Sequence, residues 1–174
     1  MHKDAEFIPL NIAVLTLSDS RTFETDTSGQ ALEDSLKAAG HNLAARELCK
    51  DEIYITRAIV SRWIADDSID VIISTGGTGL TQRDSTPEAL KPLFDQYIEG
   101  FGELFRQLSY EEIGTSTVQS RALAGLANKT LIFCLPGSTG ACRTGWNRIL
   151  EEQLDSRHRP CNFAAQTHSG ESLL

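Results

Sequence analysis

The sequence of 174 residues predicts an α/β fold in which helices cover both faces of a parallel β-sheet. Three observations lead to this prediction. Strand-like and helix-like segments alternate along the first half of the chain, in the order typical of a parallel sheet. The strand-like segments are nearly continuous apolar runs, as expected of strands buried on both faces. The length fits one compact domain, and no repeat, linker or low-complexity block divides it.

The first elements are a strand and a helix separated by a polar stretch. The strand is predicted over residues 11–17, a run rich in apolar and β-branched side chains. The helix is predicted to begin near Thr27, which has capping-box spacing to Gln30, and Gly40 can end it. One apolar stripe marks its buried face: Leu32, Leu36 and Ala39. This is the first strand–helix step of the alternation.

The alternation continues with two strands around a helix. Residues 41–49 are predicted to form the second strand, residues 52–65 a helix, and residues 70–75 the third strand. The third strand leads directly into the glycine-rich loop 76–79. Ligands of open parallel sheets gather at the carboxyl ends of the strands, so this loop is a candidate site.

The second half of the chain is predicted to add helices and two adjacent strands. Pro87 lies just inside a helix start, with Thr86 as its expected N-cap. Residues 122–126 and 130–135 are predicted strands joined through Asn128, for which a hairpin is one connection. Two further helices are indicated by apolar faces, the first formed by Phe101, Leu104, Phe105 and Leu108, the second by Trp146, Ile149, Leu150 and Leu154.

Composition limits the classes of partner. The net charge of −8 and the pI of about 5.0 argue against broad binding to nucleic acid or to an anionic membrane. No stretch approaches the roughly 20 apolar residues that span a bilayer, and residues 1–6 lack the apolar core of a signal peptide. The cysteines form no paired metal-binding pattern and are expected to be reduced. We therefore expect a cytoplasmic protein.

Three loops that follow apolar strands are rich in glycine and hydroxyl residues: residues 18–21, 76–79 and 136–140. In a parallel sheet all three can lie at the same edge. Such loops allow backbone N–H groups to approach an anion. Each loop alone is explained equally well as a tight turn, since such turns need glycine anyway. The repetition of the pattern is what indicates a phosphate site.

Several common enzyme fingerprints are missing or incomplete. The loop that starts at Gly77 lacks the last glycine of the dinucleotide-binding motif, and no P-loop motif occurs. Residues 114–118 do not fit the nucleophile elbow of α/β-hydrolases. The sequence thus argues against P-loop kinases, GTPases and α/β-hydrolases.

Two carboxylates follow predicted strand ends. Asp51 comes after the second strand and Asp84 lies beyond the glycine-rich loop. Carboxylates beside a polyphosphate usually act through Mg²⁺. Asp51 can instead cap the helix that follows it, and Asp84 can instead support its own loop. Three arginines near the loops could bind phosphate or lie free in solvent: Arg21, Arg83 and Arg143.

The segment Ser74–Ala89, STGGTGLTQRDSTPEA, closely resembles the molybdopterin-binding MoaB/Mog family. The resemblance continues through residues 100–103, 109–116, 120–122 and 128–138, and covers the chain from about Phe7 to Phe163. It implies a three-layer α/β/α fold with a mostly parallel five-stranded sheet that contains one antiparallel strand. We divide the chain into an N-terminal arm (1–9), a molybdopterin-binding domain (10–156) and a C-terminal tail (157–174) whose last residues are expected to be loose.

The resemblance also implies a place in molybdenum cofactor biosynthesis. The implied reaction transfers AMP from Mg-ATP to the terminal phosphate of molybdopterin and releases pyrophosphate. The alternative is a non-catalytic protein that binds molybdopterin or serves as a scaffold in the same pathway. The resemblance further implies a homo-oligomer, either a trimer or a hexamer made of two trimers, with other proteins of the pathway as candidate partners.

Site residues follow from the same resemblance, position by position. Asp51 and Asp84 match the catalytic acidic positions and are the expected Mg²⁺ ligands. The phosphate or nucleotide of ATP is expected to contact Ser18, Asp19, Gly76, Gly77, Thr78 and Gly79. The molybdopterin pocket is expected to include Ser116, Ser120, Pro136, Gly137 and Ser138.

Overall fold

The computed structural model describes residues 6–171. Its strands are β1 (Asn11–Leu17), β2 (Asn42–Cys49), β3 (Val71–Thr75), β4 (Gln96–Tyr97), β5 (Leu123–Ala127) and β6 (Thr130–Leu135). Its α-helices are α1 (Thr27–Ala38), α2 (Ile53–Ile64), α3 (Thr86–Leu90), α4 (Glu99–Ile113), α5 (Thr139–Gly145) and α6 (Glu151–Gln153). A π-helical segment, Trp146–Leu150, joins α5 to α6, so the last predicted helix is one nearly continuous element.

The sheet has the strand order β2-β1-β3-β6-β5-β4. The first four strands in this order are parallel, and β5 runs antiparallel to both of its neighbours, as expected for one antiparallel strand. The prediction of five strands is wrong by one. The sixth strand, β4, has only two residues, both exposed, and pairs through Gln96 with Leu126 and through Tyr97 with Gly125. Two exposed residues show no strand periodicity, which explains why the sequence did not reveal β4.

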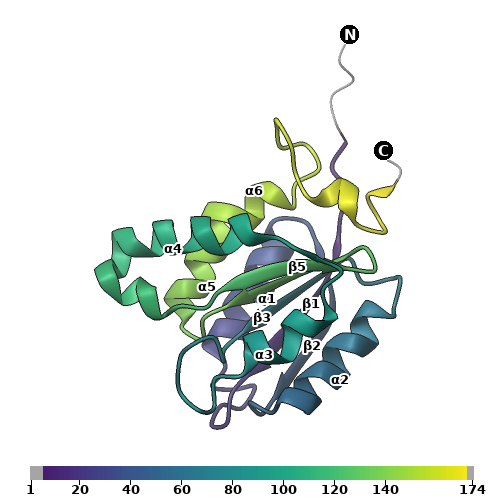
Figure 1. Cartoon of the computed structure of the whole chain (residues 1–174). Coiled ribbons are helices and arrows are strands. Elements are labelled where there is room, and N and C mark those ends of the chain that lie inside the picture. The colour runs from purple at the N-terminus through teal and green to yellow at the C-terminus, as the bar shows by residue number, and fades with distance from the viewer. Residues whose placement is uncertain (1–5, 172–174) are drawn as a thin grey trace.

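Helices cover both faces of this sheet, which confirms the three-layer prediction (Figure 1). Helices α1, α4 and α5 pack on one face, where Phe105 and Trp146 are among the largest buried side chains. Helices α2 and α3 pack on the other face around Trp63. The central strands β1, β3 and β6 are buried on both sides, as their continuous apolar sequences predict.

Two predicted helix caps are wrong by one residue. The N-cap of α1 is Asp26, whose carboxylate accepts a hydrogen bond from the backbone N–H of Gly29 at 2.9 Å, and Thr27 is already helical. Helix α3 begins after Ser85, and the hydroxyl of Thr86 donates instead to the carbonyl of Gly76 at 2.8 Å. In both cases a tertiary contact decides which polar side chain lies at the helix end.

The predicted hairpin between β5 and β6 is present. Asn128 and Lys129 form its turn and both have positive φ, 48° and 59°. Two consecutive residues of this kind are typical of a type I′ turn, whose twist matches that of the flanking strands. The amide of Asn128 donates to the carbonyl of Ile64 at 2.8 Å and so ties the turn to the end of α2.

Ser156 and the C-terminal tail that follows it pack against the N-terminal arm and the residue before β3. The Ser156 hydroxyl donates to the carbonyl of Glu6 at 2.7 Å and accepts from the N–H of Ile8 at 2.9 Å. Ser169 donates through its N–H and its hydroxyl to the buried carboxylate of Asp70, at 2.8 and 2.6 Å. The expectation of loose final residues concerns the segment 172–174, which lies outside the described residues.

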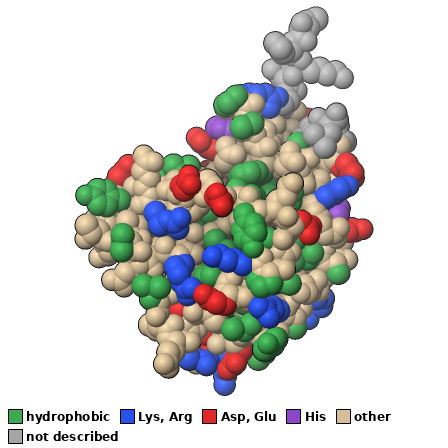
Figure 2. Space-filling model, viewed as in Figure 1, with side chains coloured by type: hydrophobic (Ala, Val, Ile, Leu, Met, Phe, Trp, Pro, Cys, Tyr) green, Lys and Arg blue, Asp and Glu red, His purple; other side chains and the backbone are tan. Residues whose placement is uncertain are grey.

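The surface carries charges of both signs. On the face shown in Figure 2, acidic and basic side chains are interspersed and do not separate into one large basic area. Within residues 6–171, no helix is long and apolar enough to cross a lipid bilayer.

Candidate active site

The sheet order creates a topological switch point between β1 and β3. After β1 the chain continues to β2 on one side, and it then returns to β3 on the other side of β1. The connections that leave β1 and β3 therefore run in opposite directions along the sheet and leave a crevice between them. Switch points of this kind are where open α/β sheets bind ligands. Because β6 lies next to β3 and parallel to it, the loop after β6 reaches the same edge. The three glycine- and hydroxyl-rich loops therefore meet, as their positions after strands predict.

A cavity of about 580 Å³ opens at this edge. It contains every residue that the sequence singled out for the site: Ser18, Asp19, Asp51, Gly76, Gly77, Thr78, Gly79, Asp84, Ser116, Ser120, Pro136, Gly137 and Ser138. Arg21 and Arg83 also line it, whereas Arg143 lines a separate surface hollow beside α1. The individual roles of these residues stay predictions, but the structure brings them to one place.

Two glycines of the loop after β3 allow a backbone approach that no other residue permits. Gly76 has a φ of +108°, and a Cβ added there would lie 2.2 Å from the carbonyl oxygen of Leu17. Gly77 has a φ of +68°, and its Cβ would lie 2.3 Å from the Thr86 hydroxyl and 2.8 Å from an oxygen of Asp51. The glycines thus let the loop cross over the end of β1 and pass against Asp51.

Asp51 carries a buried carboxylate oxygen without a hydrogen-bond partner. It follows β2 but does not cap α2, whose N-cap is Glu52 and has no side-chain cap. The interpretation of Asp51 as a helix cap is therefore wrong. Its Oδ1 atom is buried and unpaired among the described residues. Burial, reinforced by the negative charges of Asp19 and Asp84, raises the pKa of Asp51 to about 6. A partly buried, unpaired carboxylate would be stabilised by a bound cation, and such perturbed groups are common at functional sites.

Asp84 lies in a contrasting environment. Its Oδ2 atom accepts hydrogen bonds from the N–H of Thr81 at 2.9 Å and from the Thr81 hydroxyl at 2.6 Å. Burial acts to raise the pKa of Asp84, but these bonds, a further backbone bond from Gly79 and the charge of Arg121 lower it below its ordinary value. Asp84 therefore both supports its own loop and keeps an ionised carboxylate in the cavity.

An ion pair crosses the mouth of the cavity. Arg83 donates to both carboxylate oxygens of Asp19, from Nε at 2.7 Å and from Nη2 at 2.9 Å. The backbone N–H of Asp51 also donates to Asp19, at 3.2 Å. The hydrogen bond from Arg83 is the main reason why the pKa of Asp19 is lowered. The pair joins the loops after β1 and β3, and the same guanidinium also lies 3.4 Å from the carboxylate of Glu52.

Helix α4 and the segment after it form another part of the cavity wall. Phe105, Ser109 and Ile113 on α4 line it, followed by Ser116 and Ser120 at the 3₁₀ segment Gly114–Gln119 and its end. The sequence assigned Phe105 to the core, and it is only 1% exposed, so only its edge reaches the cavity. Ser109 and Ile113 had not been recognised as site residues. The apolar face of α4 marked this helix as packed on the sheet but did not reveal that its last turn borders the cavity.

The carboxylates do not form a complete metal cage. Within residues 6–171, no group of three or more His, Cys, Asp or Glu side chains is arranged to hold a metal ion. Mg²⁺ is usually bound by one or two carboxylates, several waters and the phosphates of its substrate. The unpaired oxygen of Asp51 and the ionised carboxylate of Asp84 fit such a partial ligand set.

The raised pKa of Asp51 predicts an unusual pH dependence. The folded protein holds the Asp51 proton more tightly than the unfolded chain does, since the pKa changes from an ordinary 3.8 to about 6. The contribution of this group to the free energy of unfolding therefore falls as the pH rises from about 4 to about 6, and stays constant above. The Asp51 carboxyl signal can be identified in NMR spectra by its absence in Asp51→Asn. In a pH titration this signal is expected to show a midpoint near pH 6. A midpoint near the ordinary value would contradict the burial of this group.

Comparison with known proteins agrees with the fold. A family model described as a probable molybdopterin binding domain matches residues 13–156. The chain belongs to this molybdopterin-binding domain family of molybdenum cofactor biosynthesis proteins. The resemblance found in the sequence is thereby confirmed.

Individual relatives cover nearly the whole chain. Molybdenum cofactor biosynthesis protein B of Escherichia coli K12 is 61% identical over 158 residues, which cover 91% of this chain and 93% of that protein. A crystal structure of a molybdenum cofactor biosynthesis protein B matches with a TM-score of 0.81 and 42% identity, over 84% of this chain and 91% of the other. The tungsten cofactor synthesizing protein MoaB of Pyrococcus furiosus matches with a TM-score of 0.74 and 35% identity, over 83% and 92%.

Proposed function

We propose that this protein is a Mg²⁺-dependent molybdopterin adenylyltransferase of molybdenum cofactor biosynthesis. One observation carries the proposal: a single cavity combines a glycine loop that can approach phosphate with two carboxylates of different environment, Asp51 and Asp84. A polyphosphate and a cation are the ligands that satisfy both features. We propose molybdopterin as the second substrate because the chain belongs to a family described as a probable molybdopterin binding domain, and its relatives are molybdenum cofactor biosynthesis proteins.

The reaction needs no nucleophile from the protein. An oxygen of the terminal phosphate of molybdopterin attacks the α-phosphorus of ATP, a new P–O bond forms, and the bond to the β-phosphate oxygen breaks. Pyrophosphate leaves with that electron pair. The protein aligns two anionic substrates and offsets their charge, which is how phosphoryl-transfer enzymes generally act. The backbone N–H groups of Gly77 and Thr78 and the guanidinium of Arg83 are the groups placed to do so. The N–H of Gly76 already donates to the carbonyl of Leu135, and that of Gly79 to Asp84.

Asp51 and Asp84 would hold the magnesium ion that accompanies ATP. Bound there, the ion would neutralise charge on the phosphates and orient the leaving pyrophosphate. Arg83 is paired with Asp19 by two hydrogen bonds, and we expect it to exchange this partner for a phosphate oxygen when ATP enters. Molybdopterin would lie toward α4 and the loop after β6, near Ser116, Ser120 and Pro136–Ser138. We expect the working form to be a trimer or hexamer, which light scattering would reveal.

The decisive experiment is a product assay. The purified protein is incubated with molybdopterin, ATP and Mg²⁺, and AMP-molybdopterin and pyrophosphate are followed by mass spectrometry and an enzymatic pyrophosphate assay. We expect both products in equal amounts, and neither with EDTA or with an ATP analogue whose α–β bridge is a methylene group. Molybdopterin that stays bound without any product would refute the transfer reaction and favour the binding or scaffold function.

A further inference from the structure

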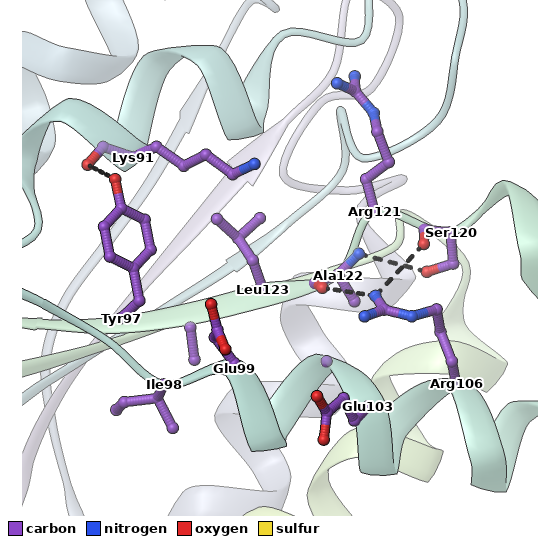
Figure 3. A pocket seen from close by; sticks show the side chains of 12 residues that line it. Lys91, Tyr97, Ile98, Glu99, Glu103, Arg106, Ser120, Arg121, Ala122 and Leu123 are labelled. Carbon is purple, nitrogen blue, oxygen red and sulfur yellow. Dashed lines mark hydrogen bonds between the residues drawn. The ribbon is translucent and has the colours of Figure 1, made fainter.

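Arg121 supports the glycine loop from outside the substrate cavity. It lies two residues before β5 and lines a second cavity, of about 680 Å³, that is bordered by β5 and the first half of α4. Figure 3 shows that Arg121 points away from Arg106, which donates to the carbonyls of Ser120 and Ala122. The two arginines therefore perform different tasks, although they line the same cavity.

Three hydrogen bonds connect Arg121 to the loop that carries Asp84. Its backbone N–H donates to the carbonyl of Thr78 at 3.0 Å, its Nε to the carbonyl of Gly79 at 2.9 Å, and its Nη2 to the carbonyl of Asp84 at 3.0 Å. Its remaining Nη1 atom pairs with Glu88 on α3. The guanidinium thus bridges the two ends of the segment 79–84, and its side chain is only 29% exposed.

The segment between these two anchors has one other tie to the rest of the protein among the described side chains, the pairing of Arg83 with Asp19 and Glu52. Leu80, Thr81 and Arg83 are exposed, and the internal bonds of the segment run mainly between Thr81 and Asp84. A Cβ on Gly79 would lie 2.8 Å from the carboxylate of Asp84, so the carboxylate packs directly over the first anchor. If the carbonyls of Gly79 and Asp84 move, the carboxylate moves with them.

We propose that Arg121 is a positioning residue for Asp84. Its hydrogen bonds set the place of the Asp84 carboxylate in the cavity, and Arg121 itself does not touch the substrates. The guanidinium is suited to this task because it is planar and always charged, and its donors reach two carbonyls at once. A lysine has a single charged centre and cannot reproduce this bridge. The kinetic part of the inference rests on the proposed function, whereas its structural part concerns the loop alone.

The kinetic test compares Arg121→Ala and Arg121→Lys with Lys91→Ala. Lys91 lines the same outer cavity and carries the same charge, but has no bond to the loop among the described residues. We expect kcat for AMP transfer to fall about 10- to 100-fold in Arg121→Ala and nearly as much in Arg121→Lys, with KM for ATP within about threefold. Lys91→Ala should match the wild type. Unchanged kcat in both Arg121 variants, or an equal loss in Lys91→Ala, would overturn the inference.

A second measurement does not depend on activity. Amide hydrogen exchange over residues 76–84 is compared in the full-length variants after circular dichroism has shown that they fold. We expect faster exchange in this segment for both Arg121 variants, and wild-type protection in β1 and β3 and in Lys91→Ala. Unchanged protection of residues 76–84 in both Arg121 variants would overturn the inference even if the wild type makes no AMP-molybdopterin. Absence of product alone would overturn only the proposed function.

Discussion

Replacement of Asp51 by asparagine is expected to abolish AMP-molybdopterin formation and, at the same time, to make the free protein more heat-stable at pH 8. At this pH the carboxylate is charged, because its pKa is about 6, and one oxygen is buried without a partner. An amide of the same shape removes this unfavourable charge. We expect kcat to fall at least about 100-fold and the melting temperature to rise by about 2–5 °C.

Thermal unfolding at pH 8 and pH 5 separates the charge effect from other causes. At pH 5 the folded protein still holds most of the Asp51 proton, but the unfolded chain has already lost it, so the stability gain of Asp51→Asn should fall to about half of its value at pH 8. Below about pH 4 the gain should nearly disappear. The matched control is Glu52→Gln, a neighbouring acidic residue whose exposed carboxylate makes only a long surface pair with Arg83, at 3.4 Å. Exposed pairs of this kind contribute little to stability, so the melting temperature should stay nearly unchanged at both pH values. A lower melting temperature for Asp51→Asn at pH 8 would mean that the carboxylate has a stabilising partner in solution.

Replacement of Asp84 by asparagine is expected to abolish AMP transfer while leaving the fold and the affinity for molybdopterin largely intact. Here the effect on stability has the opposite sign. One carboxylate oxygen of Asp84 accepts two hydrogen bonds from Thr81. In Asp84→Asn these bonds become weaker, because a neutral amide oxygen is a weaker acceptor than a charged carboxylate oxygen. We expect a loss of about 1–2 kcal/mol in the free energy of unfolding and at least a 100-fold loss in kcat, on the order seen when charge stabilisation is removed.

Urea unfolding, molybdopterin binding and product formation measured on the same Asp84→Asn preparation provide the test. The expected combination is slightly reduced stability, an affinity for molybdopterin within about threefold of the wild type, and no AMP-molybdopterin. Thr81→Val is the matched variant, because it removes the hydroxyl donor but keeps the carboxylate and the backbone bond. It should lose stability and retain most of the activity. Normal turnover by Asp84→Asn would show that the assigned role of Asp84 is wrong.

Much of the fold was predictable because each central strand is buried on both faces. Strands such as β1 and β3 then have continuous apolar sequences that local patterns identify easily. The elements that escaped prediction depend on tertiary contacts. β4 exists only because two exposed residues pair with β5, and the choice of Asp26 over Thr27 as a helix cap follows the bonds that Asp26 makes to Thr16 and Arg46.

The candidate site was predictable in composition but not in detail. Loops that follow parallel strands must meet at one edge, so the sequence could place Asp51, Asp84 and the glycines in one cavity. It could not show that Asp51 is unpaired while Asp84 is held by Thr81, since both are aspartates after strand ends. The contribution of Arg121 was also hidden, although it lies within a segment that resembles the family, because its partners are backbone carbonyls some 40 residues away.

The bond between Ser169 and Asp70 has a practical consequence. It fixes the tail beside the beginning of β1, whereas the cavity opens at the carboxyl ends of the strands. In Figure 1 the tail and the loops after β1 and β3 accordingly lie at opposite ends of the molecule. An affinity handle or biosensor linkage attached beyond Glu171 would therefore hold the protein with its cavity facing away from the support. Small ligands could then be titrated onto immobilised protein without obstruction by the anchor.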